Sequence, residues 1–216
     1  MTKTDKTAIS GRQAAAGAAL VAGVAAIGAG IFFARDKSVE RPDYDVLVAE
    51  DDFEIRQYPP LLLAETVVTS ARDRKQALER GFRMLADYIF AKSRPGERIA
   101  MTAPVLSDHL GYDDPAVGDR NDGWRIRFIM PRAYTRSSLP PAPAGIVITD
   151  APSRRVAVVR FAGLANDTML QDWEARLRLW LERRGEPKSG KVEYAFYDAP
   201  FIPGPLRRNE VLIPLN

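Results

Sequence analysis

The stretch that decides the fold lies near the C-terminal end and reads Tyr194-Ala-Phe-Tyr-Asp-Ala-Pro-Phe-Ile-Pro-Gly-Pro-Leu-Arg-Arg-Asn-Glu-Val-Leu-Ile-Pro214. It predicts a strand, a turn that is stiffened by prolines and carries two adjacent arginines, and a second strand. An earlier part of the chain is similar: Ile99-Ala-Met-Thr-Ala-Pro-Val105, a long loop, and then Trp124-Arg-Ile-Arg-Phe-Ile-Met-Pro131. In both parts we expect an Ala-Pro pair to end an apolar strand and a second strand to end in proline. This likeness indicates an internal duplication.

The segments upstream of these two parts extend the duplication. Alternating or β-branched patterns predict strands over 44–50, 53–58 and 61–69 in the first half, and over 146–149 and 155–161 in the second. A helix is expected from Ser70 in the first half, and another from Asn166 or Asp167 to Gly185 in the second. The apolar face of the first helix comprises Leu78, Phe82, Leu85 and Ile89.

Two β-α-β-β repeats, about 44–136 and 146–216, therefore make up an α+β domain over residues 44–216. A proline-rich segment, 137–145, lies between them. Each repeat leaves an apolar helix face and an apolar sheet face uncovered unless it pairs with the other repeat. We therefore expect one shared core rather than two domains.

The N-terminal region has a different composition. A run of 22 uncharged residues, Gln13 to Ala34, is long enough to cross a hydrocarbon core of about 30 Å as a helix. A cleaved signal peptide would explain the same pattern, but the apolar residues Ile31-Phe32-Phe33 continue past the small residues Gly28-Ala29-Gly30. We favour a basic, cytoplasmic-like leader over 1–12, a single-pass transmembrane anchor over 13–34 and a linker over 35–43. The short leader favours a domain on the exported side, periplasmic or extracellular.

Composition excludes several classes of function. The chain has no cysteine and a single histidine, His109, so it cannot form a thiolate site or a multi-histidine metal centre. Residues 44–216 carry 25 basic and 24 acidic side chains. Because nucleic-acid binding needs a concentrated basic face, we expect no nucleic-acid partner.

Five blocks of sequence resemble the SOUL heme-binding protein family. They are Glu54-Ile-Arg-Gln-Tyr-Pro-Pro60, Ile99–Val105, Phe128-Ile-Met-Pro131, Val156-Ala-Val-Val-Arg-Phe-Ala-Gly163, and Tyr197-Asp-Ala-Pro-Phe201 with Arg207-Arg-Asn-Glu-Val211. They occur in the family's order and span nearly all of 44–216. The resemblance implies a distorted, pseudo-two-fold antiparallel β-barrel of eight or nine strands, two helices packed outside it, and a heme or other tetrapyrrole ligand.

The resemblance also implies a binding surface on the first helix and on the loop before the last strand. Its residues here are Phe82, Met84, Leu85, Met101, Tyr197, Arg207 and Arg208. Such a surface would bury the apolar disc of a porphyrin and pair its propionates with the two arginines. Core packing would equally explain Phe82 and Leu85, and pairing with Glu210 or Asp198 would explain the arginines.

His109 is the side chain that could be an axial ligand to heme iron. It lies outside the matching blocks, in a predicted loop over 106–123, where a solvated histidine is the simpler explanation. We therefore expect heme to dock without a strong protein ligand, and we expect no other metal-ion site.

Three functions remain open at this point. The first is a membrane-anchored tetrapyrrole carrier or buffer that catalyses nothing. The second is a small-molecule-binding protein or a hydrolytic enzyme on the same fold, using Glu54, Glu65, Tyr88 or Tyr197 in a cleft between the repeats. The third is a membrane-tethered interaction domain without heme. No spacing selects an acid–base pair, so a binding protein is expected, with an unknown oligomeric state.

Overall fold

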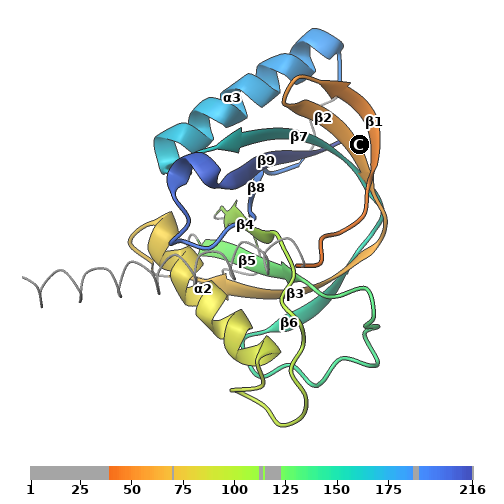
Figure 1. The fold of residues 1–216 in the computed structure, drawn as a ribbon, viewed down its shortest axis with the longest axis vertical. Coiled ribbons are helices and arrows are strands. Elements are labelled where there is room, and N and C mark those ends of the chain that lie inside the picture. Colours follow the sequence, from red (N-terminus) through yellow and green to blue (C-terminus); the bar gives the residue numbers. More distant parts are fainter. Residues whose placement is uncertain (1–38, 70, 112–113, 115–122, 187–189, 216) are drawn as a thin grey trace, which may run out of the picture. The chain divides into compact units, whose positions relative to one another are not determined.

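The computed structural model describes residues 39–69, 71–111, 114, 123–186 and 190–215. The expected leader, anchor and most of the linker, as well as Ser70, lie outside these residues. The elements, shown in Figure 1, are β1 (Asp45–Glu50), β2 (Phe53–Tyr58), β3 (Leu61–Val68), α2 (Arg74–Ile89), β4 (Val105–Leu110), β5 (Gly123–Ile129), β6 (Val147–Ala151), β7 (Arg154–Ala162), α3 (Asp167–Arg184), β8 (Glu193–Phe196), the 3-10 helix η2 (Gly204–Leu206) and β9 (Arg208–Leu215). In this described part, no helix has the length and apolar character that a membrane crossing requires.

The nine strands form one antiparallel sheet in the order β1-β2-β7-β9-β8-β4-β5-β3-β6. β4 and β8, the equivalent strands of the two repeats, pair at its middle. On one side of this pair lie β9, β7 and β2, and on the other lie their counterparts β5, β3 and β6. β2 comes from the first repeat but pairs with β7, and β6 comes from the second but pairs with β3. Each predicted repeat thus contributes a strand to the other half of the sheet, and the α+β class is confirmed.

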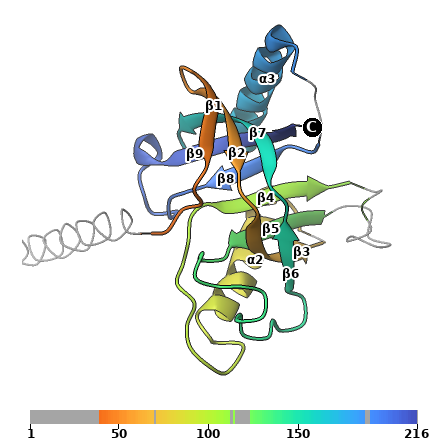
Figure 2. The same cartoon turned by 90° about the vertical axis from the view of Figure 1, so that its right-hand side faces the viewer.

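The sheet is not closed into a barrel, which corrects that part of the prediction. β1 and β6 are its outermost strands, and no pairing joins them among the residues that the structure describes. Figure 2 shows how β2 continues into β3 and β6 into β7. Pro59-Pro60 lies between β2 and β3, and Pro152 lies between β6 and β7. Because proline has no N–H to donate, strand pairing is interrupted there, and the chain passes from one half of the sheet to the other.

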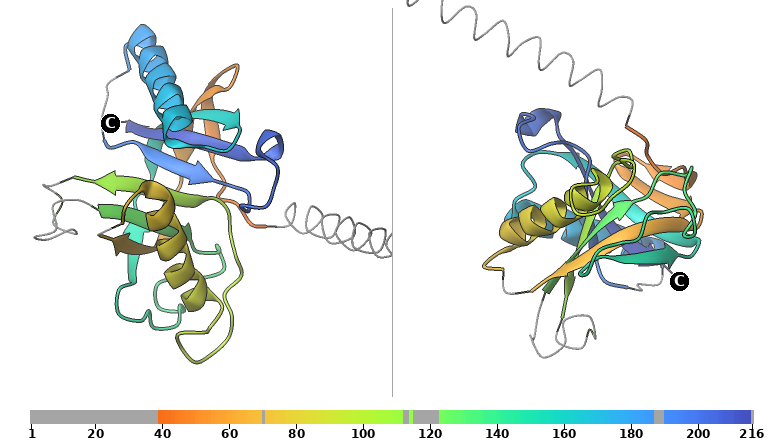
Figure 3. Two further views of the ribbon diagram at one scale, coloured as in Figure 1. Left: turned by 90° about the vertical axis from the view of Figure 1, so that its left-hand side faces the viewer. Right: turned by 90° about the horizontal axis from the view of Figure 1, so that it is seen from below.

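Both helices cover the same face of the sheet. Val105 of β4 belongs to the apolar cluster under α2, and its direct partner Phe196 of β8 packs against the cluster under α3. Directly paired residues point to the same face, so we name this the outer face and the opposite one the inner face. Figure 3 shows β4 and β8 lying between the two helices.

Local signals explain where the helices begin and end. The Asp73 side chain caps α2 by accepting the Gln76 N–H at 2.8 Å, so the helix starts four residues after the predicted Ser70. Asn166 caps α3, and Gly185, with a φ of 66°, ends it in the left-handed conformation; both were predicted.

The segment before β4 differs from the prediction. Residues 99–104 form no strand, and β4 begins at Val105 and continues through Leu110, inside the predicted loop. Ala103-Pro104 therefore precedes β4, whereas Ala199-Pro200 follows β8, and the two pairs are not equivalent. The Thr102 hydroxyl donates to the Ile129 carbonyl at 2.5 Å, which holds this segment at the end of β5.

The end of the predicted linker is docked on the domain. The Glu40 carbonyl accepts the Ala103 N–H at 2.9 Å, and the Glu40 carboxylate accepts the backbone N–H of Arg132 at 2.7 Å. Arg132 also pairs with Asp43 at 2.8 Å. Residues 40–43 are thus part of the folded unit, and the point at which the chain enters the domain is fixed.

Candidate functional site

The inner face of the sheet is charged. Side chains alternate along a strand, and Val211 and Ile213 of β9 lie in the cluster under α3. Glu210 and Leu212 therefore point to the inner face. The same alternation places Arg56 and Tyr58 of β2 there, because Ile55 lies in the cluster under α3. Charged groups without solvent contact must be paired to be stable.

Glu210 is the centre of an inner network, which comprises Tyr44, Arg56, Tyr58, Tyr197, Arg208 and Glu210. The Glu210 side chain is fully buried and accepts two hydrogen bonds from the Arg56 guanidinium, at 3.0 and 3.1 Å. Arg208 donates to it at 2.6 Å and the Tyr197 hydroxyl at 2.7 Å. Both carboxylate oxygens are therefore occupied.

The pKa values of the groups in this network indicate a structural role rather than a catalytic one. Burial alone would raise the pKa of Glu210, but the hydrogen bonds and charge of Arg56, followed by those of Arg208, hold it below its ordinary value. Burial raises the pKa of Tyr58 to about 12. Burial and then the charge of Glu210 raise the pKa of Tyr197 well above its ordinary value. Neither hydroxyl is poised to lose a proton near neutral pH.

A second network lies further along the inner face. Asp108 pairs with Arg127 at 2.7 Å and with Arg125 at 2.8 Å. Glu193 pairs with Arg154 at 2.6 Å. Burial alone would raise the pKa of Glu193, but the charges and hydrogen bonds of Arg127 and Arg154 lower it to about 2. Ion pairs thus lie at two places on the inner face.

The structure divides the predicted site residues between the two faces. Tyr197 and Arg208 both contact Glu210, so their side chains belong to the inner face. Phe82, Met84 and Leu85 lie on α2, over the outer face. The seven predicted residues therefore do not form one continuous surface.

The three α2 residues also differ from one another. Leu85 is fully buried in the core. Phe82 is 40% exposed, and its ring meets the edge of the Phe128 ring at 5.3 Å. Met84 contacts the Thr66 hydroxyl instead, on the side of β3. Residues two apart on a helix do not share a face, so Phe82 and Met84 lie on opposite flanks of α2.

Phe82 lies on the flank of α2 that leads toward the β8–β9 loop, residues 197–207. Phe128 pairs with Val105, and Val105 pairs with Phe196, which directly precedes the loop. Two strand spacings, about 10 Å, thus separate Phe128 from the start of the loop. Met101 is half-buried against the cluster under α2, in the segment that leads into β4. Phe82 and Met101 are the predicted residues that present apolar surface at this place.

The Arg207 side chain forms hydrogen bonds within its own loop. Its guanidinium donates to the carbonyl of Ile202 at 2.7 Å and to the carbonyl of Pro200. A propionate would have to compete with both carbonyls for it.

His109 lies in β4 rather than in a loop, which corrects its predicted setting. It is exposed on the outer face, with its ring 4.9 Å from that of Trp124. Four residues of strand separate it from Val105, which corresponds to about 13 Å. Among the described residues, no group of three or more histidine, aspartate or glutamate side chains could hold a metal ion.

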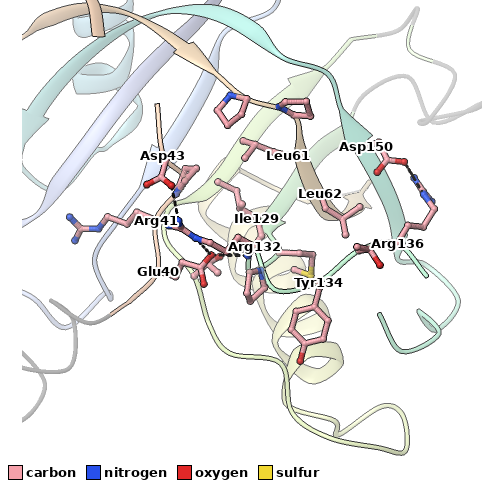
Figure 4. A pocket seen from close by; sticks show the side chains of 17 residues that line it. Glu40, Arg41, Asp43, Leu61, Leu62, Ile129, Arg132, Tyr134, Arg136 and Asp150 are labelled. Carbon is pink, nitrogen blue, oxygen red and sulfur yellow. Dashed lines mark hydrogen bonds and ion pairs between the residues drawn. The ribbon is translucent and has the colours of Figure 1, made fainter. Parts of the chain in front are cut away.

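A separate cavity of about 420 Å³ lies beside the docked linker. Its walls are mainly apolar and include Pro59, Leu62, Met130 and Tyr134. Figure 4 shows two ion pairs at its rim, Arg132 with Asp43 and Arg136 with Asp150. None of the seven predicted residues lines it, although Thr102, which follows Met101, does.

Comparison with known proteins identifies the family. The family model described as SOUL heme-binding protein matches residues 39–214. The chain belongs to this family. "Heme-binding protein 2" of Mus musculus is 28% identical over 173 residues, which cover 77% of this chain and 82% of the relative. The protein of the same name from Homo sapiens is 29% identical over the same shares of both chains. These relatives are named as binding proteins and not as enzymes.

Solved structures show the same fold at low identity. The C-terminal domain of EcmrR has a TM-score of 0.57 at 12% identity, covering 80% of this chain and 98% of that domain. A hydrolase from Listeria innocua has a TM-score of 0.52 at 10% identity, covering 79% of this chain and 94% of the hydrolase. At this identity the likeness concerns the fold alone.

Three of the four side chains named for the enzyme alternative make structural contacts in this SOUL-family domain. Glu54 pairs with Arg56 at 2.6 Å, and the Tyr197 hydroxyl donates to Glu210. The Tyr88 hydroxyl donates to the Pro140 carbonyl at 2.7 Å, and burial raises its pKa. Each of these groups therefore serves a structural contact.

The sequence missed Arg56 and Glu210 as a buried pair, although both occur in blocks that resemble the family. A signal was present, because both occupy positions of apolar strands that alternate with core residues. Charged residues at such positions usually face water, and 154 positions in the chain separate this pair.

Proposed function

We propose that this chain is a tetrapyrrole-binding protein that catalyses nothing and carries or buffers heme. We further propose that residues 13–34 attach it to a membrane, with the domain on the exported side. Family membership supports the ligand class. The occupied oxygens of Glu210 and the raised tyrosine pKa values support a role without acid–base chemistry.

The proposed binding surface lies on the outer face between α2 and the β8–β9 loop. The observation that carries it is Phe82, an aromatic side chain left 40% exposed over the buried ring of Phe128. Met101 adds half-buried apolar surface against the cluster under α2. The Tyr197 and Arg208 side chains support the loop from the inner face, and Arg207 is the cation within the loop itself.

No protein ligand to the iron is part of this proposal. A heme that docks on Phe82 and the loop lies at the Val105 end of β4, whereas His109 lies about 13 Å along that strand. Apolar docking without axial ligation gives modest affinity, because burial of the disc supplies the driving force. The iron would then retain a solvent or other exogenous ligand.

Hemin titration of the full chain in detergent micelles, followed by Soret absorbance, tests the proposal. We expect saturable one-to-one binding that Phe82→Ala weakens about tenfold, since partial burial of a phenylalanine contributes about 1–2 kcal/mol. Leu179→Ala, which truncates a side chain 52% exposed on α3, is the matched control and should leave affinity unchanged.

The variants also separate the two candidate places. Tyr134→Ala changes the cavity beside the linker without touching α2. Weakening by Tyr134→Ala with no effect of Phe82→Ala would move the site to that cavity. Absence of saturable binding to the wild-type chain would refute the ligand class itself.

A further inference from the structure

The loop between β8 and β9 carries an unusual group of exposed side chains. Phe201 is 67% exposed, Leu164 63% and Leu206 61%, the three highest values among the large apolar side chains of the described residues. Leu164 lies directly against the loop, since a Cβ added to Gly204 would be 3.1 Å from its Cδ2 atom. We name Leu164, Phe201 and Leu206 the apolar tip.

The loop is built so that the tip stays exposed. Pro200, Pro203 and Pro205 limit its conformations. The Arg207 side chain bonds two carbonyls of the loop, and Gly163 donates its N–H to the Gly204 carbonyl at 3.0 Å. These bonds hold the backbone of the loop in the conformation in which the apolar side chains are exposed. Exposure of rigid apolar groups is typical of a surface that binds something.

The tip lies on the side where the chain enters the domain. The Arg41 guanidinium is 5.5 Å from the centre of the Tyr197 ring, at the start of the loop. Figures 2 and 3 agree in placing the first described residues beside the β8–β9 loop. Glu40 is hydrogen-bonded to Ala103 and Arg132 of the domain, so the position at which the chain enters the domain is fixed.

The number of residues between position 34 and the docked Glu40 limits the distance between the domain and residues 13–34. Six steps lead from Ala34, the last uncharged residue of that run, to the docked Glu40. A fully extended chain spans at most about 21 Å over that length. If the run is a membrane anchor, the tip is within reach of the same bilayer.

We propose that the apolar tip docks into the interfacial layer of the membrane that holds the anchor. The inference rests on the proposed anchor but not on heme binding. In interfacial insertion, apolar groups enter only the outer part of the bilayer, and binding strength increases with the apolar area that they bury. Arg41 and Arg207 flank the tip and add attraction to anionic headgroups.

A second copy of this chain fits the tip less well. Three side chains at about 60% exposure offer roughly 300 Å², whereas a stable interface needs about 800 Å² from each partner. A bilayer has no such threshold, because each side chain that enters it contributes independently.

The chain contains no cysteine, so a single introduced thiol can be labelled specifically. We would place an environment-sensitive fluorophore at Leu164→Cys, Phe201→Cys or Leu206→Cys in the full chain. The controls are Val147→Cys and Leu179→Cys, at positions that are 60% and 52% exposed on β6 and α3. Each variant is reconstituted into vesicles of phosphatidylcholine with phosphatidylglycerol, some containing nitroxide-labelled lipid.

We expect blue-shifted emission and quenching by the nitroxide lipid at the three tip positions and not at the two controls. Phe201→Ser in the Leu206→Cys background should lower the ratio of docked to undocked domain about tenfold. An alkaline carbonate wash, which removes proteins that are not integral to the membrane, tests the anchor separately. If the chain resists the wash but all five positions give equal signals, or the tip shows no quenching, docking is wrong and the anchor is retained. If the wash releases the chain, both the anchor and the docking are wrong. A concentration-dependent shift without lipid would assign the tip to self-association instead.

Discussion

Removal of the Glu210 carboxylate should be among the most damaging single changes in the domain. Glu210→Ala leaves the Arg56 guanidinium, which is 1% exposed, without its main counter-charge. Arg208 is 26% exposed and can turn toward water, so most of the cost arises at Arg56. Deleting one partner of a buried ion pair typically costs about 3–5 kcal/mol.

Urea and thermal unfolding of the full chain measure this cost. In a domain of this size, 1 kcal/mol corresponds to about 2–4 °C in Tm, so Glu210→Ala should lower Tm by about 6–20 °C. The matched control is Asp150→Ala, which breaks the Arg136–Asp150 pair on the surface, where the side chains are 54% and 68% exposed. Such surface pairs contribute at most about 1 kcal/mol.

A double variant tests whether the loss of stability in Glu210→Ala comes from the unpaired charge of Arg56. Arg56→Met with Glu210→Leu removes both charges and fills the space with apolar atoms, which is often neutral or stabilising for a buried pair. We expect it to recover most of the stability lost in Glu210→Ala. If Glu210→Ala is as stable as Asp150→Ala, the inner network does not hold the sheet together and the structural role assigned to it is wrong.

Three further predictions follow from particular contacts. Because the pKa of Glu193 is lowered to about 2, its contribution, about 3 kcal/mol, is complete above pH 4.5 and disappears as the pH falls toward 2; urea unfolding from pH 7 to 3 should show less acid loss in Glu193→Gln. Gly81→Ala should destabilise by about 1–3 kcal/mol despite its better helix propensity, because the new Cβ would lie 2.8 Å from the Cβ and Cγ1 atoms of Ile126; Ile126→Val removes only the Cδ1 atom, so the double variant should keep most of the cost. His109→Ala should leave the Soret maximum and hemin affinity unchanged, and a shift of the maximum would contradict docking without a protein ligand.

Features that depend on neighbouring residues could be predicted from the sequence. Asn166 and Gly185 mark the ends of α3 because capping involves only nearby backbone groups. The duplication was visible because both repeats keep the same order of strands and helix. The position of β4 was not predictable in this way. Its inner-face residue Asp108 pairs with Arg125 and Arg127 of the next strand and interrupts the apolar stripe of Leu106 and Leu110, so the strand resembles a polar loop in sequence.

The candidate site was predictable only in part, for a related reason. The family resemblance selected α2 and the β8–β9 loop, but it did not assign side chains to faces. A strand reverses the direction of its side chains at each residue, so Phe196 contacts the helix face while Tyr197 reaches Glu210 on the other. Met84 and Phe82 were separated by the corresponding rule for helices.

The charged inner face restricts where an apolar ligand can bind. A tetrapyrrole between the two halves of the sheet would have to displace the Arg56–Glu210 pair or the Glu193–Arg154 pair, and each displaced group would lose its partner without gaining water. Binding on the outer face breaks neither pair. Phe82 is already partly exposed there, so the ligand covers surface that the fold has left in water. The same ion pairs that join strands across the inner face thus leave the outer face and the cavity beside the linker as the places for the ligand. Phe82→Ala and Tyr134→Ala decide between these two places.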